Sequence, residues 1–200
     1  GLRSDLRPEV TLANKITAGR FVLSFVYFAA VLVVGHAGSW DWLVWDIATA
    51  IFLITVITDA FDGYYARKYK EVTSVGRIAD PLVDKVVICG AFILFLGNPV
   101  TQSVLPPWMV LVVVLREFVV SGVRSFVEAQ GVAFGANVWG KIKMVIQCGA
   151  VVAGQVYAAH AAQWTWARWC AIGAMWIMLA ATLISGATYL VEARRVFRDR

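Results

Sequence analysis

Long apolar stretches alternate with short polar segments along the whole chain. Each apolar stretch has about the 17–25 residues that a helix needs to cross the hydrocarbon core of a bilayer. The segments between them carry the glycine, proline, serine and charged residues that are typical of turns. We therefore expect an all-α fold, an integral membrane bundle of six transmembrane helices. The predicted spans lie at about 17–36, 42–67, 78–97, 105–128, 139–160 and 165–192.

Composition also places the chain in a membrane. Of its 200 residues, 60% are hydrophobic and 16% are charged, and the mean hydropathy is +0.71. A soluble domain contains roughly 45–50% apolar residues. The sequence shows no linker rich in serine, glycine or proline and no internal repeat. We therefore expect a single membrane-embedded domain over residues 1–200.

Most lysine and arginine residues lie at every second polar segment. The predicted connections at 36–41, 97–103 and 160–164 contain neither residue type. Basic connections stay on the cytoplasmic side of a membrane, so we expect both termini to be cytoplasmic in a multi-pass protein of the cell (inner) membrane. The net charge of +5 reflects this asymmetry and attraction to anionic lipid headgroups. It gives no case for nucleic-acid binding.

Four aspartates lie between the second and third apolar stretches. Asp59 and Asp62 are three residues apart, and Asp80 and Asp84 are four apart, so each pair shares one face of a helix. Four carboxylates at close range repel one another unless cations neutralise them. Oxygen ligands without histidine or cysteine favour Mg²⁺ or Mn²⁺, with Ca²⁺ as an alternative. Two such ions would suit a displacement at phosphorus.

Small and basic residues beside the aspartates suit a phosphate-bearing ligand. Gly63 and Ala66 leave room for a ligand to approach the helix, and Arg67 can bind a diphosphate. Gly76 permits close approach at the start of the next helix. An interfacial aspartate is often a helix cap instead, and Asp80, which precedes a proline, fits that description. Carboxylates inside membranes are costly, so the complete cluster favours a functional site.

The aspartates and their neighbours form a pattern that resembles the motif of the CDP-alcohol phosphotransferase family. Every fixed position and spacing matches: D-x2-D-G-x2-A-R-x8-G-x3-D-x3-D. The resemblance implies six transmembrane helices, a homodimer, and an enzyme that transfers a phosphatidyl or related group from a CDP-linked donor to an alcohol, with release of CMP. It also implies Asp84 as the general base. The two Mg²⁺ ions would be bound by Asp59, Asp62, Asp80 and Asp84.

The start of the chain extends this resemblance. The stretch LANKITAGRF is similar to the PNxLTxxR start common in the family, with Ala13 in place of the proline. Asn14 and Thr17 match that pattern, and they either contact the nucleotide or cap the first helix. By resemblance, the CDP site consists of Asn14, Thr17, Asp62, Gly63, Ala66, Arg67 and Gly76.

The fourth predicted helix carries basic residues that favour an anionic acceptor. Arg116 and Arg124 are eight residues apart, close to one helical face. Two arginines there favour a phosphate-bearing acceptor, with Lys141 and Lys143 opposite. Glu117 would neutralise Arg116. The alternative for Arg124 and the two lysines is anchoring to lipid headgroups.

The stretches LREFVVSGVRSFVEAQG and GKIKMVIQ resemble members of the family that use glycerol 3-phosphate. We therefore expect transfer of a phosphatidyl group from CDP-diacylglycerol to glycerol 3-phosphate, in phospholipid biosynthesis, with the active site facing the cytoplasm. Inositol phosphate and phosphatidylglycerol are alternative acceptors. A divalent-cation transporter is a remote alternative, because the outer halves of the helices are apolar apart from Asp41 and Asp46. The intact motif disfavours an inert lipid-binding scaffold.

Overall fold

The computed structural model describes residues 12–34, 41–69, 74–129, 138–161 and 163–198. Side chains are described at 19–34, 41–58, 85–127, 139–161, 163–191 and 194. Within this part of the chain every regular element is a helix, which confirms the predicted all-α class. The helices are α1 (Leu12–Val33), α2 (Asp41–Tyr69), α3 (Ser74–Phe95), α4 (Pro99–Gln102), α5 (Pro107–Ala129), α6 (Val138–His160) and α7 (Thr165–Arg198).

Six of these helices coincide with predicted spans, and α4 lies where a turn was predicted. Its single turn forms because the Asn98 side chain accepts a hydrogen bond from the Val100 amide at 2.9 Å, with Pro99 as the first helical residue. Thr101 adds a hydrogen bond from its hydroxyl to the Phe95 carbonyl at 2.5 Å. These local bonds make a short helix from a polar segment that hydropathy assigns to a connection.

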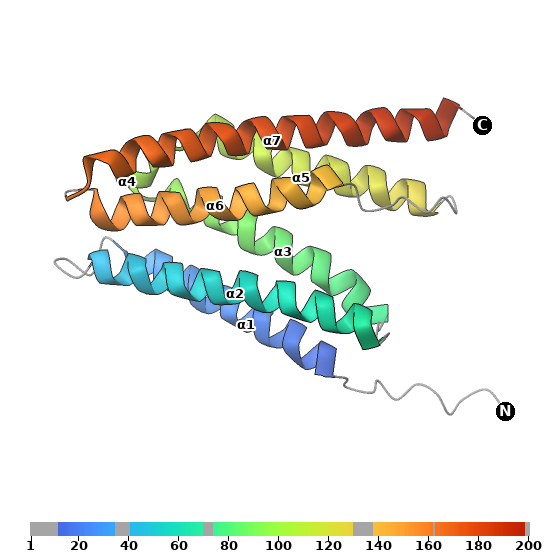
Figure 1. Ribbon diagram of the computed structural model, residues 1–200, viewed down its shortest axis with the longest axis horizontal. Helices are drawn as coiled ribbons and strands as arrows, with labels where there is room; N and C mark the ends of the chain where they lie inside the picture. The colour runs from blue at the N-terminus through green and yellow to red at the C-terminus, as the bar shows by residue number, and fades with distance from the viewer. Residues whose placement is uncertain (1–11, 35–40, 70–73, 130–137, 162, 199–200) are drawn as a thin grey trace.

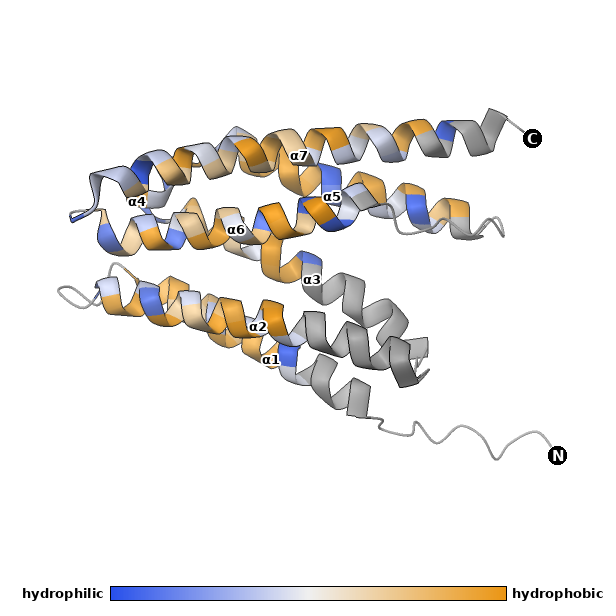
Figure 2. Cartoon of the chain, in the orientation of Figure 1, coloured by the Kyte–Doolittle hydropathy of each residue, from blue (hydrophilic) through white to orange (hydrophobic). Residues whose placement is uncertain are grey.

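Among the described residues, three helical stretches are long and apolar enough to cross a membrane by length and composition. They are Asp41–Thr58, Trp139–His160 and Thr165–Val191. Two shorter apolar stretches, Gly19–Val33 and Lys85–Phe95, accompany them. Apolar residues predominate along the described helices (Figure 2). The chain is therefore a helical membrane protein, whereas the count of six spans stays a prediction.

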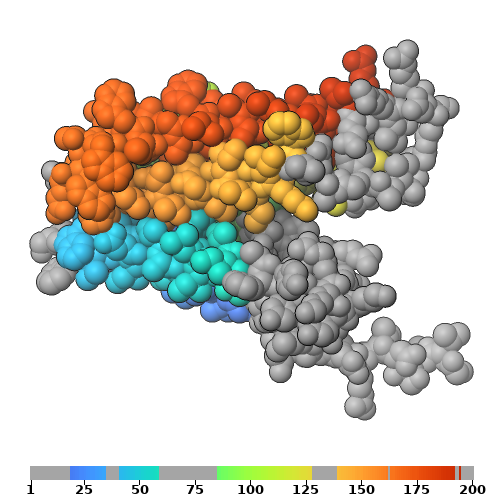
Figure 3. All heavy atoms as spheres, in the orientation of Figure 1, coloured from blue at the N-terminus to red at the C-terminus, as the bar shows by residue number. Residues whose placement is uncertain are grey.

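The helices form two groups that meet along α2 and α6. Helix α1 packs against α2 and α3, and α7 packs against α5 and α6. Atoms of α2 and α6 touch over a long stretch (Figure 3). The start of α1, the end of α7 and the facing ends of α2 and α3 all lie at one end of the bundle, towards which the ribbons of the two groups separate (Figure 1).

The opposite half of the bundle holds the main apolar core. Trp45 of α2 and Phe95 of α3 make an edge-to-face ring contact with centroids 5.9 Å apart. Gly154 of α6 lies against Phe95, since a Cβ there would come within 2.6 Å of the Phe95 ring. Small residues let membrane helices approach closely, so Gly154 permits the tight packing of α6 on α3.

A buried polar pair crosses this half of the bundle. The Gln155 side chain of α6 donates a hydrogen bond from Nε2 to the Tyr27 hydroxyl of α1 at 2.8 Å, and both residues are fully buried. Buried polar groups need such partners, because an unmade hydrogen bond in an apolar setting costs free energy. This contact therefore joins α1 directly to the second helix group.

We expect Tyr27→Phe to lower the free energy of unfolding by about 0.5–2 kcal/mol, the range seen for hydrogen bonds between membrane helices. Equilibrium unfolding in detergent micelles measures the loss. Gln155→Leu and the double variant complete a double-mutant cycle. The double variant should lose less than the two single variants together, and strictly additive losses would show that the hydrogen bond does not couple α1 to α6.

Candidate functional site

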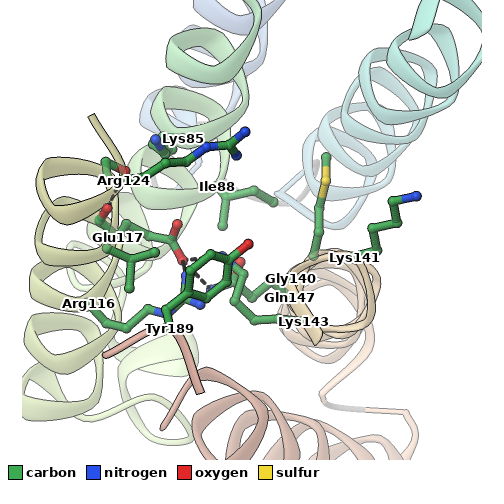
Figure 4. A pocket seen from close by; sticks show the side chains of 13 residues that line it. Lys85, Ile88, Arg116, Glu117, Arg124, Gly140, Lys141, Lys143, Gln147 and Tyr189 are labelled. Atoms are coloured by element: carbon green, nitrogen blue, oxygen red, sulfur yellow. Dashed lines mark hydrogen bonds and ion pairs between the residues drawn. The ribbon is translucent and has the colours of Figure 1, made fainter. Parts of the chain in front are cut away.

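A cavity of about 240 Å³ lies among α3, α5, α6 and α7 (Figure 4). Its charged lining residues comprise five basic side chains and one acidic side chain among the described residues. These six are Lys85, Arg116, Glu117, Arg124, Lys141 and Lys143. The remaining lining residues include Ser121, Gln147 and Tyr189. The excess of positive charge makes the cavity suited to an anion.

Glu117 of α5 is the centre of a buried hydrogen-bonded group. Its Oε1 atom accepts from Arg116 Nη1 at 3.1 Å and from Gln147 Nε2 at 3.4 Å. The same oxygen accepts from the Nζ atom of Lys143 on α6. Glu117 and Lys143 are only 6% and 7% exposed, so this ion pair lies inside the bundle. The group joins α5 to α6 through opposite charges.

Helix α7 fixes the Arg116 side chain from the other side. Arg116 Nη2 donates to the Ser185 hydroxyl at 2.5 Å, and the guanidinium carbon lies 5.8 Å from the centre of the Tyr189 ring. Gly186 makes room for the arginine stem, since a Cβ there would come within 3.3 Å of Arg116 Cγ. Gln147 of α6 also reaches α7, where it lies 3.5 Å from the Thr182 hydroxyl. Arg116 is therefore held in one position at the cavity wall.

The other basic residues of the cavity are more accessible. Arg124 and Lys141 are exposed, and Lys85 is half-buried. In the close view Lys141 points away from the other labelled side chains (Figure 4). The cavity thus has one wall of largely enclosed cations, Arg116 and Lys143, and a set of more exposed long side chains around it.

The structure brings all four predicted acceptor residues, Arg116, Arg124, Lys141 and Lys143, to this one cavity. The expected pairing of Glu117 with Arg116 is also present. Sequence reasoning missed Lys85, which directly follows Asp84 in the motif, and the contributions of Gln147 and Tyr189. It also missed that Glu117 binds Lys143. The binding role of these residues stays a prediction.

The predicted metal and nucleotide residues lie outside the described side chains. Asn14 and Thr17 belong to α1, Asp59, Asp62, Gly63, Ala66 and Arg67 to α2, and Gly76, Asp80 and Asp84 to α3. Among the described side chains, no group of three or more histidine, cysteine or acidic residues could hold a metal ion.

The helix bounds place two of the predicted metal ligands near the connection between α2 and α3, and their role stays a prediction. Asp62 lies seven residues before the end of α2, and Asp80 lies six residues after the start of α3. At a rise of 1.5 Å per residue, both lie about 10 Å from those neighbouring helix ends. The four carboxylates are a donor set of hard oxygens, which is the chemistry that Mg²⁺ prefers.

The fold and the cavity together define a helical membrane protein with a cationic site between its helices, of the kind that accommodates phosphate groups. The chain belongs to the CDP-alcohol phosphatidyltransferase family, whose sequence model matches residues 10–189. It is therefore an enzyme of the phosphatidyltransferase class.

Three bacterial relatives of this chain carry the same name, CDP-diacylglycerol–glycerol-3-phosphate 3-phosphatidyltransferase. The Bacillus subtilis protein is 34% identical over 190 residues, which cover 89% of this chain and 92% of the relative. The Rickettsia felis protein is 28% identical and covers 96% of this chain and 100% of the relative. The Cereibacter sphaeroides protein is 25% identical, over 95% of this chain and 96% of its own. Similarity thus extends over nearly the full length.

Gly186 provides a test of how tightly α7 holds Arg116. We expect Gly186→Ala to crowd the Arg116 stem, which Glu117 and Ser185 prevent from shifting, at a cost of about 1–3 kcal/mol in unfolding free energy. Gly173→Ala on the same helix is the matched control, because a Cβ there meets nothing within 4 Å. That control should gain up to about 1 kcal/mol from helix propensity. Equal stability of the two variants in thermal unfolding would contradict the close fit.

Proposed function

We propose that this protein transfers the phosphatidyl group of CDP-diacylglycerol to glycerol 3-phosphate, giving phosphatidylglycerophosphate and CMP. The observation that carries the proposal is the cationic cavity, which has five basic side chains and one acidic side chain among the described residues, inside a member of the CDP-alcohol phosphatidyltransferase family. The names of the relatives from three bacteria support the same donor and acceptor.

The cavity suits an acceptor that carries a phosphate. Arg116 presents a fixed guanidinium, and Lys143 presents an ammonium beside it. Charge-assisted hydrogen bonds from such groups bind phosphate oxygens strongly. A neutral alcohol would leave this concentration of positive charge uncompensated. Inositol phosphate would meet the same charges, so the preference for glycerol 3-phosphate rests on the relatives.

The residues proposed to hold two Mg²⁺ ions are Asp59 and Asp62 of α2 with Asp80 and Asp84 of α3. Mn²⁺ is an alternative for the same oxygen ligands. Bound there, the ions would polarise phosphoryl oxygens and stabilise negative charge on the leaving group. The nucleotide would be bound by Asn14, Thr17, Asp62, Gly63, Ala66, Arg67 and Gly76.

The reaction we propose is a single displacement. The Asp84 carboxylate takes the proton from the terminal hydroxyl of the acceptor. The hydroxyl oxygen forms a bond to the phosphorus that bears diacylglycerol. The bond from that phosphorus to the CMP oxygen breaks, and CMP leaves with the electron pair while Arg67 stabilises its charge. Arg116 and Lys143 keep the acceptor in position, which lowers the entropic part of the barrier.

The placement in the membrane follows from the basic residues. Both chain ends, the α2–α3 connection and the α5–α6 connection are proposed to face the cytoplasm, because they carry most of the lysine and arginine residues. Support comes from the described helix ends, which lie on one side of the bundle (Figure 1). We further propose six spans in the inner membrane and a homodimer, as the family resemblance implies.

The transporter alternative is disfavoured by the core. Trp45, Phe52, Phe92 and Phe95 are buried and fill the half of the bundle opposite the cavity. An ion path through a membrane needs polar groups or water along its length, and large apolar side chains close it. An enzyme that works from one membrane face fits this packing better.

The acceptor test is CMP release from CDP-diacylglycerol in detergent, with glycerol 3-phosphate, glycerol, inositol phosphate and phosphatidylglycerol supplied one at a time. We expect glycerol 3-phosphate to be used best and free glycerol poorly. Arg124→Ala should raise the KM for glycerol 3-phosphate about ten- to a hundredfold, as expected for a lost charge-assisted contact of about 1.5–3 kcal/mol. The KM for CDP-diacylglycerol should change little.

Arg168→Ala is the matched control for this test, because Arg168 is an exposed arginine of α7 that does not line the cavity. It should behave as the parent does. Equal losses of Arg124→Ala with glycerol and with glycerol 3-phosphate would show that Arg124 supports the fold or contacts lipid, and does not bind the acceptor phosphate.

Removal of divalent cations should abolish the reaction, since the four carboxylates would otherwise repel one another and the leaving group would lose its counter-charge. CMP release in excess EDTA measures this, and added Mg²⁺ should restore it. Zn²⁺ should restore it poorly, because zinc sites in proteins favour histidine and cysteine ligands. Undiminished turnover in EDTA would rule out the two-metal proposal.

A further inference from the structure

Glu117 and Lys143 form an ion pair inside the bundle, beside a second cation whose side chain is 10% exposed. Both cations, Lys143 and Arg116, bind the same carboxylate oxygen although they come from different helices. We propose that Glu117 is a positioning residue, which keeps Lys143 protonated and holds Lys143 and Arg116 together at the cavity wall for an anionic phosphate group. This inference rests on the proposed function, because it assigns a role within the same cavity.

The surroundings of Lys143 make its charge depend on Glu117. Lys143 is only 7% exposed, and a buried ammonium without a counter-charge gives up its proton rather than remain charged. The neighbouring basic groups disfavour a further positive charge. Among the described residues, the titratable groups that line the cavity or interact electrostatically with Lys143 are Lys85 and Cys89 of α3, Arg116, Glu117 and Arg124 of α5, Lys141 of α6 and Tyr189 of α7. Among these described side chains, Glu117 alone is acidic.

The contacts of Glu117 also fix its own position. Gln147 donates to the carboxylate, and the Ser121 hydroxyl donates to the Glu117 carbonyl at 2.6 Å. Ser185 holds the far side of Arg116. The positive charges of Lys143 and Arg116 are thereby kept close together. Without the carboxylate between them, the two cations would repel each other. The contacts within the fold offset the repulsion between the two cations before a ligand binds.

The arrangement leaves donors available for a ligand. An ammonium carries three N–H groups, and among the described residues Lys143 makes one hydrogen bond, to Glu117. Two N–H groups of Lys143 thus make no hydrogen bond to a described residue, and a phosphate could accept from them. If Glu117 lost its charge, Lys143 would become neutral as the pH rises, and its contribution to phosphate binding would fall.

The main test compares Glu117→Gln with the parent in steady-state CMP release. We expect the KM for glycerol 3-phosphate to rise about tenfold or more, as for loss of a charge-assisted contact, while kcat changes less. The ratio of the variant KM to the parent KM should increase from about pH 6.5 to about pH 9, below the ordinary range of lysine titration. Taking this ratio removes the titration of the acceptor phosphate itself.

A double-mutant cycle separates positioning from general support of the fold. Lys143→Gln should raise the KM by a similar factor, with a ratio to the parent that does not depend on pH. Adding Glu117→Gln to Lys143→Gln should then raise the KM much less than Glu117→Gln does in the parent, because Glu117 acts mainly through Lys143 and Ser185 still holds Arg116. Glu117→Asp keeps the charge and should restore part of the loss. Additive effects in the cycle, or a pH-independent ratio for Glu117→Gln, would overturn the proposal.

The double variant also covers the case in which Glu117→Gln does not fold. It removes both members of the pair and leaves no uncompensated buried ammonium at this point. If Glu117→Gln is unfolded, Glu117→Asp and the double variant should still fold. The double variant should then show the KM and the pH dependence of Lys143→Gln. A double variant with the KM of the parent would overturn the proposal.

A binding measurement separates this inference from the proposed reaction. Inorganic phosphate should raise the thermal unfolding temperature of the parent, and the shift should be smaller in Glu117→Gln and Lys143→Gln, because stabilisation follows ligand affinity. If the parent released no CMP with glycerol 3-phosphate, the proposed function would fail while this test remained valid. Equal shifts in the parent and in Glu117→Gln would overturn the role of Glu117.

Discussion

The cavity depends on the contacts of the buried Glu117 carboxylate with Arg116 and Lys143. One oxygen atom binds an arginine of α5 and a lysine of α6, and the arginine continues the contact to Ser185 of α7. Three helices are therefore joined by one buried charge. A buried ion pair adds little net stability, because desolvation offsets attraction. What it provides here is a defined geometry for two cations that would otherwise separate.

Different interactions hold the helices together at the two ends of the bundle. At one end, aromatic rings and small residues such as Gly154 pack closely, and the Tyr27–Gln155 hydrogen bond orients α1 relative to α6. Membrane helices associate through such packing, since lipid gives them no hydrophobic drive to do so. At the other end, the described lining of the cavity combines charged and polar side chains with a few apolar ones such as Ile88, Val120 and Met144. A rigid apolar half can thus position a charged half whose like charges oppose close packing.

Features that are set by residues of one helix could be predicted from the sequence, whereas contacts between helices could not. Helix ranges and the basic residues Arg116 and Arg124 could be read from local patterns, because their spacing along one helix fixes their relation. The Glu117–Lys143 pair could not, since its members are 26 residues apart on different helices. The capped turn α4 was also missed, because hydropathy does not register hydrogen bonds such as that of Asn98. Side chains of the aspartate motif lie outside the described residues, so that prediction still rests on the motif.

Helix α3 links the predicted chemistry to the observed cavity. Asp84, the proposed base, and Lys85, which lines the cavity, are consecutive residues of that helix. Consecutive Cα atoms are about 3.8 Å apart, so the backbone of the proposed base lies at the edge of the cationic cavity. A small acceptor with a phosphate at one end and a hydroxyl at the other could occupy the cavity and still reach that edge. The charge of the cavity would then select the acceptor. Because Asp84 directly precedes Lys85 on α3, an acceptor bound in the cavity would have its hydroxyl near the proposed base.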